Sequence, residues 1–207
     1  MTAGDTGVMG DGALVAPVPA REGRRRAAHY GGTVPAAAAR VRPALPADVH
    51  AIHDLVEPYA AERILLAKEW VAYYEAVQEF MVAEAVDGPL AGQVVGCGAL
   101  HVMWQDLAEI RTLAVDPRYR GRRVGHELLD ALLERARDLG LHRLFCLTFE
   151  VDFFAGHGFR PIEGTPVTPE VYAELLRSHD DGVAEFLDLA RVKPNTLGNT
   201  RMLIELD

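Results

Sequence analysis

Apolar positions repeat with strand-like and helix-like periods in turn from about residue 41 onward. A short strand is expected at 41–43. A helix follows, with Asp48 near its start and one apolar face formed by Ile52, Leu55, Val56 and Tyr59. A second helix is expected over about 68–76. This alternation predicts a mixed α/β fold.

The same reading continues through the second half of the chain. Apolar runs at 80–84 and 94–100 flank Asp87-Gly88 and predict a hairpin. A strand over about 109–115 leads into a helix that ends near Gly140. The apolar face of that helix comprises Val124, Leu128, Leu129, Leu132, Leu133, Ala136 and Leu139.

Two further segments complete the predicted sheet. The continuous apolar run 144–148 predicts a strand buried on both faces. Residues 153–159 predict a short helix that leads into another strand. The expected architecture is therefore a mixed central sheet flanked by helices, formed by one domain over residues 40–207.

Residues 1–39 differ from this pattern. Alanine, glycine and proline make up about half of them, and no periodicity is sustained, which predicts a disordered tail. Arg24-Arg25-Arg26 is followed by no long apolar run, and Pro17 and Pro19 interrupt the apolar stretch before it. A secretory signal and a membrane span are therefore not expected, and we predict a cytoplasmic protein.

Charge and cysteine usage narrow the function classes. The tail holds four arginines and three acidic residues, so the remaining residues account for −10 of the total net charge of −9. Nucleic-acid binders have the opposite balance, so we expect no nucleic-acid partner. Cys97 and Cys146 lie in apolar runs and are expected to be buried, reduced thiols. No spacing of His, Cys or Asp indicates a metal site, and His101, His126 and His157 are expected to be structural or surface residues.

Candidate ligand-binding residues cluster between strand 109–115 and the helix that follows it. The loop between them, residues 118–123, carries Arg118, Arg120, Arg122 and Arg123. Gly121 and Gly125 let the backbone approach a ligand closely, and the helix N-terminus presents free N–H groups. Together these features predict an anion site. The alternative is a solvated arginine-rich loop that caps a core helix.

Neither the P-loop nor the Rossmann glycine pattern is present. The segment instead resembles the GNAT acetyltransferase superfamily, whose fourth strand leads into an [R/Q]-x-x-G-x-[G/A] loop that binds the pyrophosphate of acetyl-coenzyme A. Arg120 and Gly125 match the ends of that motif, whereas Arg123 stands where the inner glycine is usual. The resemblance covers 41–163 and implies acetyl-CoA as co-substrate, with no metal.

Several segments resemble, more specifically, the acetyltransferase domain of N-acetylglutamate synthases, in particular the short stand-alone form known from actinobacteria. The segments that carry this resemblance are 64–68 (ILLAK), 96–101 (GCGALH), 108–115 (AEIRTLAV), 143–149 (RLFCLTF) and 192–203 (VKPNTLGNTRML). It implies an amino-acid N-acetyltransferase that acts on the α-amine of L-glutamate, in the first step of arginine biosynthesis.

The resemblance implies roles for individual residues. Glu109 is the expected base, with a surface carboxylate on a strand as the alternative. Burial next to the thioester would raise its pKa. A backbone N–H of residues 113–115 would stabilise the oxyanion. Many family members carry a tyrosine acid where this chain has Phe154. The coenzyme would contact Leu113, Ala114, Val115, Arg120, Gly121, Arg122, Arg123, Val124, Gly125 and His126.

A glutamate acceptor brings two carboxylates, so cations are expected to converge on it. The predicted acceptor residues are Lys68, Arg111, Thr200 and Arg201, with Arg111 on the same strand face as Glu109. Two alternatives stay open: an acetyltransferase for another amine such as glutamine, and a non-catalytic acetyl-CoA-binding sensor. The sequence is compatible with a homodimer and does not determine the oligomeric state.

Overall fold

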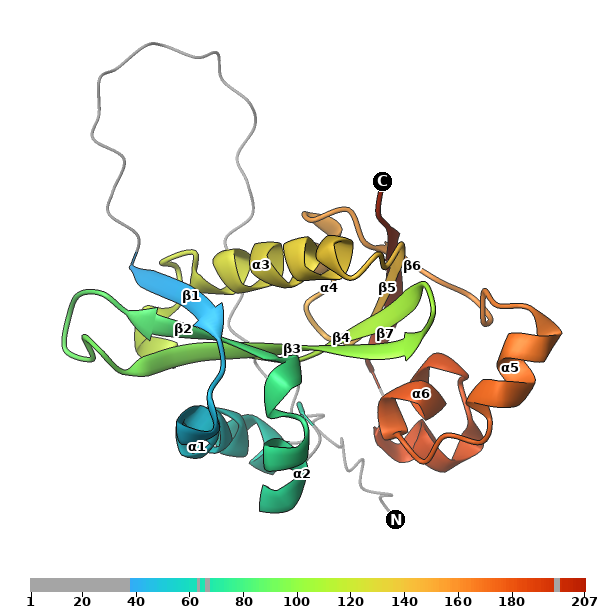
Figure 1. Ribbon diagram of the computed structural model, residues 1–207, viewed down its shortest axis with the longest axis horizontal. Coiled ribbons are helices and arrows are strands. Elements are labelled where there is room, and N and C mark those ends of the chain that lie inside the picture. Colours follow the sequence, from blue (N-terminus) through green and yellow to red (C-terminus); the bar gives the residue numbers. More distant parts are fainter. Residues whose placement is uncertain (1–37, 63, 66–67, 196–197) are drawn as a thin grey trace, which may run out of the picture.

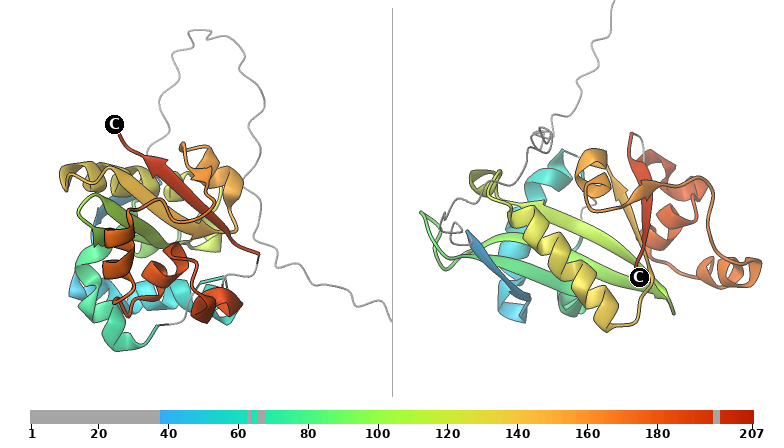
Figure 2. Two further views of the ribbon diagram at one scale, coloured as in Figure 1. Left: turned by 90° about the vertical axis from the view of Figure 1, so that its right-hand side faces the viewer. Right: turned by 90° about the horizontal axis from the view of Figure 1, so that it is seen from above.

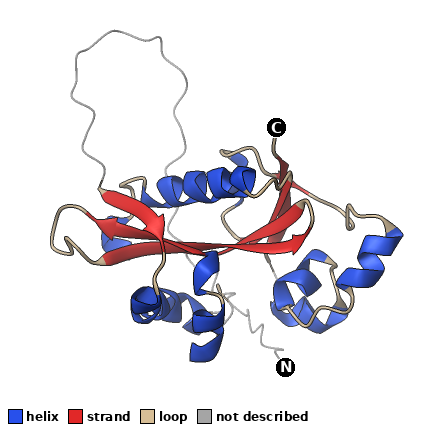
Figure 3. Cartoon of the chain, in the orientation of Figure 1, coloured by secondary structure: helices blue, strands red, loops and turns tan. Residues whose placement is uncertain are grey.

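A computed structural model describes residues 38–62, 64–65, 68–195 and 198–207. Within them, seven strands form one mixed sheet in the order β1-β2-β3-β4-β5-β7-β6 (Figures 1 and 3). The strands are β1 (Ala39–Pro43), β2 (Phe80–Ala85), β3 (Val94–Trp104), β4 (Leu107–Val115), β5 (Arg143–Thr148), β6 (Arg160–Pro161) and β7 (Thr200–Glu205).

Helices cover both faces of this sheet. Figure 1 shows α3 on one face, with α1 and α2 on the other. Figure 2 shows α5 and α6 at one end of the molecule, beyond β5 and β7. The α-helices of the described residues are α1 (Val49–Ala61), α2 (Trp70–Glu75), α3 (Val124–Asp138), α4 (Val151–Ala155), α5 (Pro169–Leu175) and α6 (Asp181–Phe186).

Helix α3 fixes the position of the loop before it. Its apolar stripe is buried from Val124 to Ala136, with Leu128, Leu129 and Leu132 at 0% exposure. Leu139, predicted on the same face, is instead 55% exposed, because the helix ends at Asp138 and Leu139 is its C-cap. Gly140 ends the helical segment at φ +73°, a conformation that favours glycine. Because the stripe is buried along its length, the helix N-terminus is held next to the end of β4.

The two strands next to β4 pair with it over different lengths. β3 pairs antiparallel with β4 along most of its length, whereas β5 pairs parallel with it only from Leu107 to Glu109. The two parallel strands therefore separate after Glu109. In β4 itself, Thr112 (φ +57°) and Leu113 form a bulge opposite Gly98, whose hypothetical Cβ would lie 2.9 Å from the Leu113 side chain.

The predicted elements are confirmed over 39–161, with ends that differ by a few residues. Short helices α5 and α6 and strand β7 have no counterpart in the prediction. With seven and six residues, the two helices are too short for a sustained apolar period. Their visible signals are Thr168-Pro169 and Asp180, which cap them. The tail predicted over 1–39 lies outside the described residues, except for Ala38 and Ala39.

The cysteines in the described part of the chain are as expected. Cys97 and Cys146 are free and buried, and burial raises the pKa of the Cys97 thiol to about 12. No group of His, Cys, Asp or Glu there is arranged to hold a metal ion. Likewise, none of the helices found there has the length and apolar character to cross a bilayer.

Candidate active site

Glu109 lies in β4 at the point where β5 separates from it, and its carboxylate is withdrawn from solvent. The residue is 3% exposed, and Oε2 makes no hydrogen bond within the described residues. Burial raises the pKa of Glu109 to about 7, although Arg111 favours its ionised form, and Glu185 and Asp180 raise it further. A carboxyl that changes charge near neutral pH can accept a proton there. The carboxyl is thus buried with a raised pKa, and its position next to the thioester stays a prediction.

The backbone of α6 closes over this carboxylate. A Cβ added at Gly182 would lie 2.0 Å from Oε2 and 2.8 Å from Cδ of Glu109. No side chain larger than hydrogen fits there unless the carboxylate or the helix moves. Gly182 therefore allows α6 to approach Glu109 closely enough to exclude water from that side.

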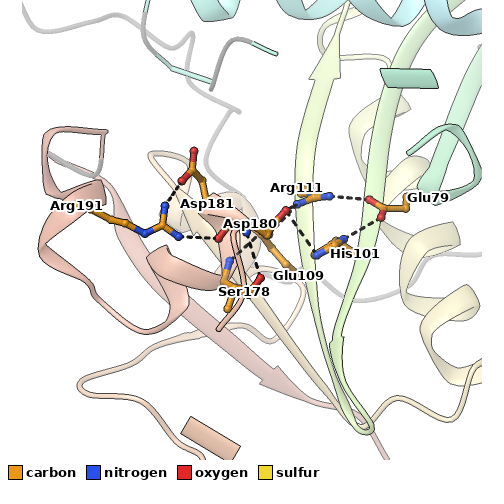
Figure 4. A network of polar contacts seen from close by, with 9 residues as sticks. Glu79, His101, Glu109, Arg111, Ser178, Asp180, Asp181 and Arg191 are labelled. Atoms are coloured by element: carbon orange, nitrogen blue, oxygen red, sulfur yellow. Dashed lines mark hydrogen bonds and ion pairs between the residues drawn. The ribbon is translucent and has the colours of Figure 1, made fainter. Parts of the chain in front are cut away.

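Arg111 connects β4 to the elements on either side of it (Figure 4). Its Nη2 donates to Glu79 Oε2 and its Nη1 to Asp180 Oδ2, both over 2.8 Å. Nη1 also lies 3.8 Å from Glu109 Oε2, which confirms the shared strand face. His101 Nδ1 lies 2.8 Å from the other oxygen of Glu79. Two carboxylates already pair with Arg111, so its guanidinium holds α6 to the sheet beside Glu109.

The predicted acceptor residues fall into two groups. Lys68 is half-buried near Arg111 and Glu109, and burial lowers the pKa of its ammonium group, with Arg111 adding to the effect. Arg201 projects from β7 and donates through Nη2 to the carbonyls of Gly164 and Phe186. Its Nε is buried without a partner in the described residues. Thr200 pairs with Thr148 at the start of β7.

The arginine loop takes the conformation that its sequence pattern requires. Arg123 adopts φ +67° as the residue before α3, and Gly121 adopts φ +74°. A non-glycine residue in this region carries about 1–3 kcal/mol of strain, so the surrounding structure must hold it there. The arginine at the usual glycine position thus adopts the left-handed backbone conformation that favours glycine.

The side chains of the loop have different partners. Arg118 pairs with Asp116 over 2.7 Å, and Arg122 pairs with Asp87 over 3.0 Å. Arg120 donates to the hydroxyl of Tyr59, which in turn donates to the carbonyl of Val115. Arg120 is thus directed toward the end of β4, next to the loop predicted to bind the pyrophosphate.

Strand end, loop and α4 meet at Gly125. A Cβ added there would lie 3.7 Å from both Val115 and the ring of Phe153, which is ordinary van der Waals contact. His126 follows in α3, with its Nδ1 3.2 Å from Nε2 of His157. Phe154 is buried in the core, so no acidic side chain stands at that position. Predicted coenzyme residues from β4 and α3 are therefore neighbours in space.

Several groups around Glu109 are absent from the predicted site: Glu79, Asp180, Gly182 and Glu185. Three of them lie in or next to α6. This helix is too short to show a repeating apolar pattern in the sequence. The one local signal is Asp180, whose side chain caps α6 by accepting from the N–H of Val183. That signal marks a helix start and does not indicate that the helix covers Glu109.

The chain resembles known acetyltransferases. Residues 48–159 match the acetyltransferase (GNAT) family. An amino-acid acetyltransferase from Mycobacterium tuberculosis is 63% identical over 166 residues, which are 80% of this chain and 94% of that protein. One from Aeromonas salmonicida is 31% identical over 157 residues, which are 74% of this chain and 33% of that longer protein.

Solved structures agree with these sequence matches. The crystal structure of Rv2747 from Mycobacterium tuberculosis, in complex with CoA and NLQ, superposes with a TM-score of 0.77 at 61% identity, covering 81% of this chain and 99% of that one. N-acetylglutamate synthase from Neisseria gonorrhoeae, complexed with coenzyme A and N-acetyl-glutamate, gives 0.64 at 23% identity, covering 82% and 35%. At that identity the second match shows the fold alone.

The contact between Gly182 and Glu109 yields a stability prediction. Replacing Gly182 by alanine should lower the free energy of unfolding by about 1–3 kcal/mol, because the new methyl group overlaps the carboxylate. In a Glu109→Ala background the same change should be neutral or stabilising, since alanine is the better helix residue. Urea unfolding of the four proteins in this cycle measures the difference. An equal cost in both backgrounds would show that the clash lies elsewhere.

Proposed function

This chain belongs to the acetyltransferase (GNAT) family, and on that premise we propose that it acetylates the α-amine of an amino acid, with L-glutamate as acceptor. The observation that carries the proposal is the buried carboxyl of Glu109, with its pKa raised to about 7, at the point where β4 and β5 separate. The relative that is 63% identical is named an amino-acid acetyltransferase, which supports the same reaction class.

The proposed chemistry begins with a proton. The acceptor amine attacks only after its ammonium form loses a proton, and Glu109 would take it. Amine nitrogen then bonds to the thioester carbon, and a backbone N–H among residues 113–115 would stabilise the oxyanion. Collapse breaks the carbon–sulfur bond and releases a thiolate. The ordinary thiol pKa of about 8.5 makes that a good leaving group, which is compatible with Phe154 at the usual tyrosine position.

The coenzyme would lie between the end of β4 and the N-terminus of α3. Arg120 points there, and the free N–H groups of the first turn of α3 favour phosphate oxygens. The strained backbone at Arg123 supports this assignment, because strain of this kind is retained where a defined loop shape is needed.

The acceptor assignment rests on charge. Lys68 and Arg201 remain for the acceptor carboxylates, since Arg111 is paired with Glu79 and Asp180. That pairing reduces the cationic charge open to a second acceptor carboxylate. It therefore favours glutamine, which carries only the α-carboxylate, as the second candidate acceptor.

Glu109→Gln tests the proposed base. The variant should lose about 10²- to 10⁴-fold in turnover, because glutamine keeps the shape but accepts no proton. Thiol release from acetyl-CoA with L-glutamate and L-glutamine measures this, and calorimetry should show unchanged acetyl-CoA affinity. Near-normal turnover would remove Glu109 from the mechanism. Absence of thiol release by the unmodified protein with any of the twenty amino acids would favour a non-catalytic sensor.

Gly125 tests the coenzyme position. Gly125→Glu should abolish measurable acetyl-CoA binding, because it places a carboxylate beside the phosphates. Gly125→Gln has the same bulk without the charge and should bind more tightly than the glutamate variant. Calorimetric titration compares the two, and thermal unfolding checks that both fold. Wild-type affinity in the glutamate variant would contradict the assignment.

Lys68→Met and Arg201→Met test the acceptor site. Each should raise the apparent KM for L-glutamate about tenfold or more at nearly constant acetyl-CoA affinity, since a charge-assisted hydrogen bond contributes about 1.5–3 kcal/mol. Whichever cation meets the γ-carboxylate should matter more for glutamate than for glutamine. Steady-state kinetics with both amino acids distinguish these effects. Unchanged glutamate kinetics in both variants would refute this acceptor site.

A further inference from the structure

A second acidic side chain, Glu185, is withdrawn from solvent on the element that closes over Glu109. It is 6% exposed, and the nearby cations Arg111 and Lys68 favour its ionised form. Burial raises the pKa of Glu185 to about 7, with Asp181 and Asp180 adding to the effect. Ionisation of an acid buried in this way costs free energy, and the raised pKa reflects that cost.

The geometry of α6 relates Glu185 to Glu109. Gly182 touches the Glu109 carboxylate, and Glu185 follows it by three residues, which places both on the same side of the helix. α6 cannot shift away independently, because Asp180 at its start is held by Arg111 of β4. The contacts that bury Glu109 therefore also hold the helix that carries Glu185.

We propose that Glu185 is a positioning residue of the reaction: its carboxylate forms a like-charged pair with Glu109 across the α6–β4 contact and makes Glu109 a stronger base. The inference rests on the proposed role of Glu109. No proton need pass through Glu185, which acts only through its charge on the residue that touches the acceptor.

The other charged groups around Glu109 shift its pKa in both directions. Arg111 of β4 and His101 of β3 favour its ionised form, whereas Asp180 and Glu185 of α6 oppose it. Lys68, before α2, faces the same cluster, and Cys146 of β5 is a neutral thiol beside it. Arg111 is the strongest of the cations, and Asp180 and Glu79 already pair with it. Glu185 is therefore the acid whose charge is least compensated by a direct partner.

Removing the Glu185 charge should make Glu109 a weaker base. In Glu185→Gln the acid limb of kcat/KM against pH should move to lower pH by about one unit, the size expected for a strongly interacting pair. Turnover above the limb should fall about three- to tenfold, because proton transfer follows base strength. Glu185→Asp keeps the charge and should restore most of the wild-type limb.

Asp181 supplies the matched control. It lies on the same helix, its side chain is 51% exposed, and it pairs with Arg191. Asp181→Asn should move the acid limb far less than Glu185→Gln does, because Asp181 acts through the pKa of Glu185. An unmoved limb in Glu185→Gln, or an equal shift in Asp181→Asn, would overturn the proposal. If Glu109→Gln itself retains turnover and the acid limb, the proposed function of Glu109 fails instead.

A measurement on the unmodified protein covers the case in which Glu185→Gln does not fold. Carbon-13 NMR of the glutamate carboxyl groups should show Glu109 titrating in two steps, since each carboxyl senses the ionisation of the other. A one-step titration of Glu109 that is independent of Glu185 would overturn the proposal.

Discussion

A carboxylate held out of water is the constraint on which the rest of this site depends. Glu109 is 3% exposed, and one of its oxygens lacks a hydrogen-bond partner among the described residues. Ionisation of such a group costs free energy, so its proton affinity rises toward neutral pH. The fold creates that cost by bringing the α6 backbone against the carboxylate at Gly182. The cationic and acidic neighbours only adjust it.

The sheet changes its pairing next to the proposed base. β5 pairs with β4 as far as Glu109 and then leaves it, and the bulge at Thr112 reshapes β4 beyond that point. Buried α3 places its N-terminus beside the end of the same strand, with Arg123 in a strained conformation before it. The proposed base, the strand end and the proposed anion-binding turn thus follow one another within seventeen residues, from Glu109 to Gly125.

Most of the sheet and the helices that cover it could be predicted, because their apolar periods are long. Leu128, Leu129 and Leu132 belong to an apolar pattern that repeats over a helix of fifteen residues. Glu109 and Arg111, two positions apart on a strand, are expected on one face for the same kind of reason. The helix that covers Glu109, α6, could not be predicted in this way. α6 has six residues, and its effect depends on Gly182 meeting a side chain 73 positions earlier in the chain. Local pattern carries no information about such a contact.

The partners of Arg111 likewise could not be predicted from the local sequence. Alternation places it beside Glu109, as the structure confirms, but two carboxylates from distant segments pair with it. A cation that the resemblance assigns to the acceptor is thus occupied by the protein itself. Its role as an anchor for α6 follows from tertiary packing and could not be derived from its neighbours in sequence.

The pH dependence of kcat/KM for the unmodified protein tests the central claim most directly, because this quantity reports the ionisation of groups in the free enzyme. If the buried carboxyl of Glu109 is the base, activity should rise with pH through a midpoint of about 7, and Glu109→Gln should lack that rise. A midpoint near 4.5, the ordinary value for glutamate, would contradict the account. So would a rise that persists unchanged in Glu109→Gln.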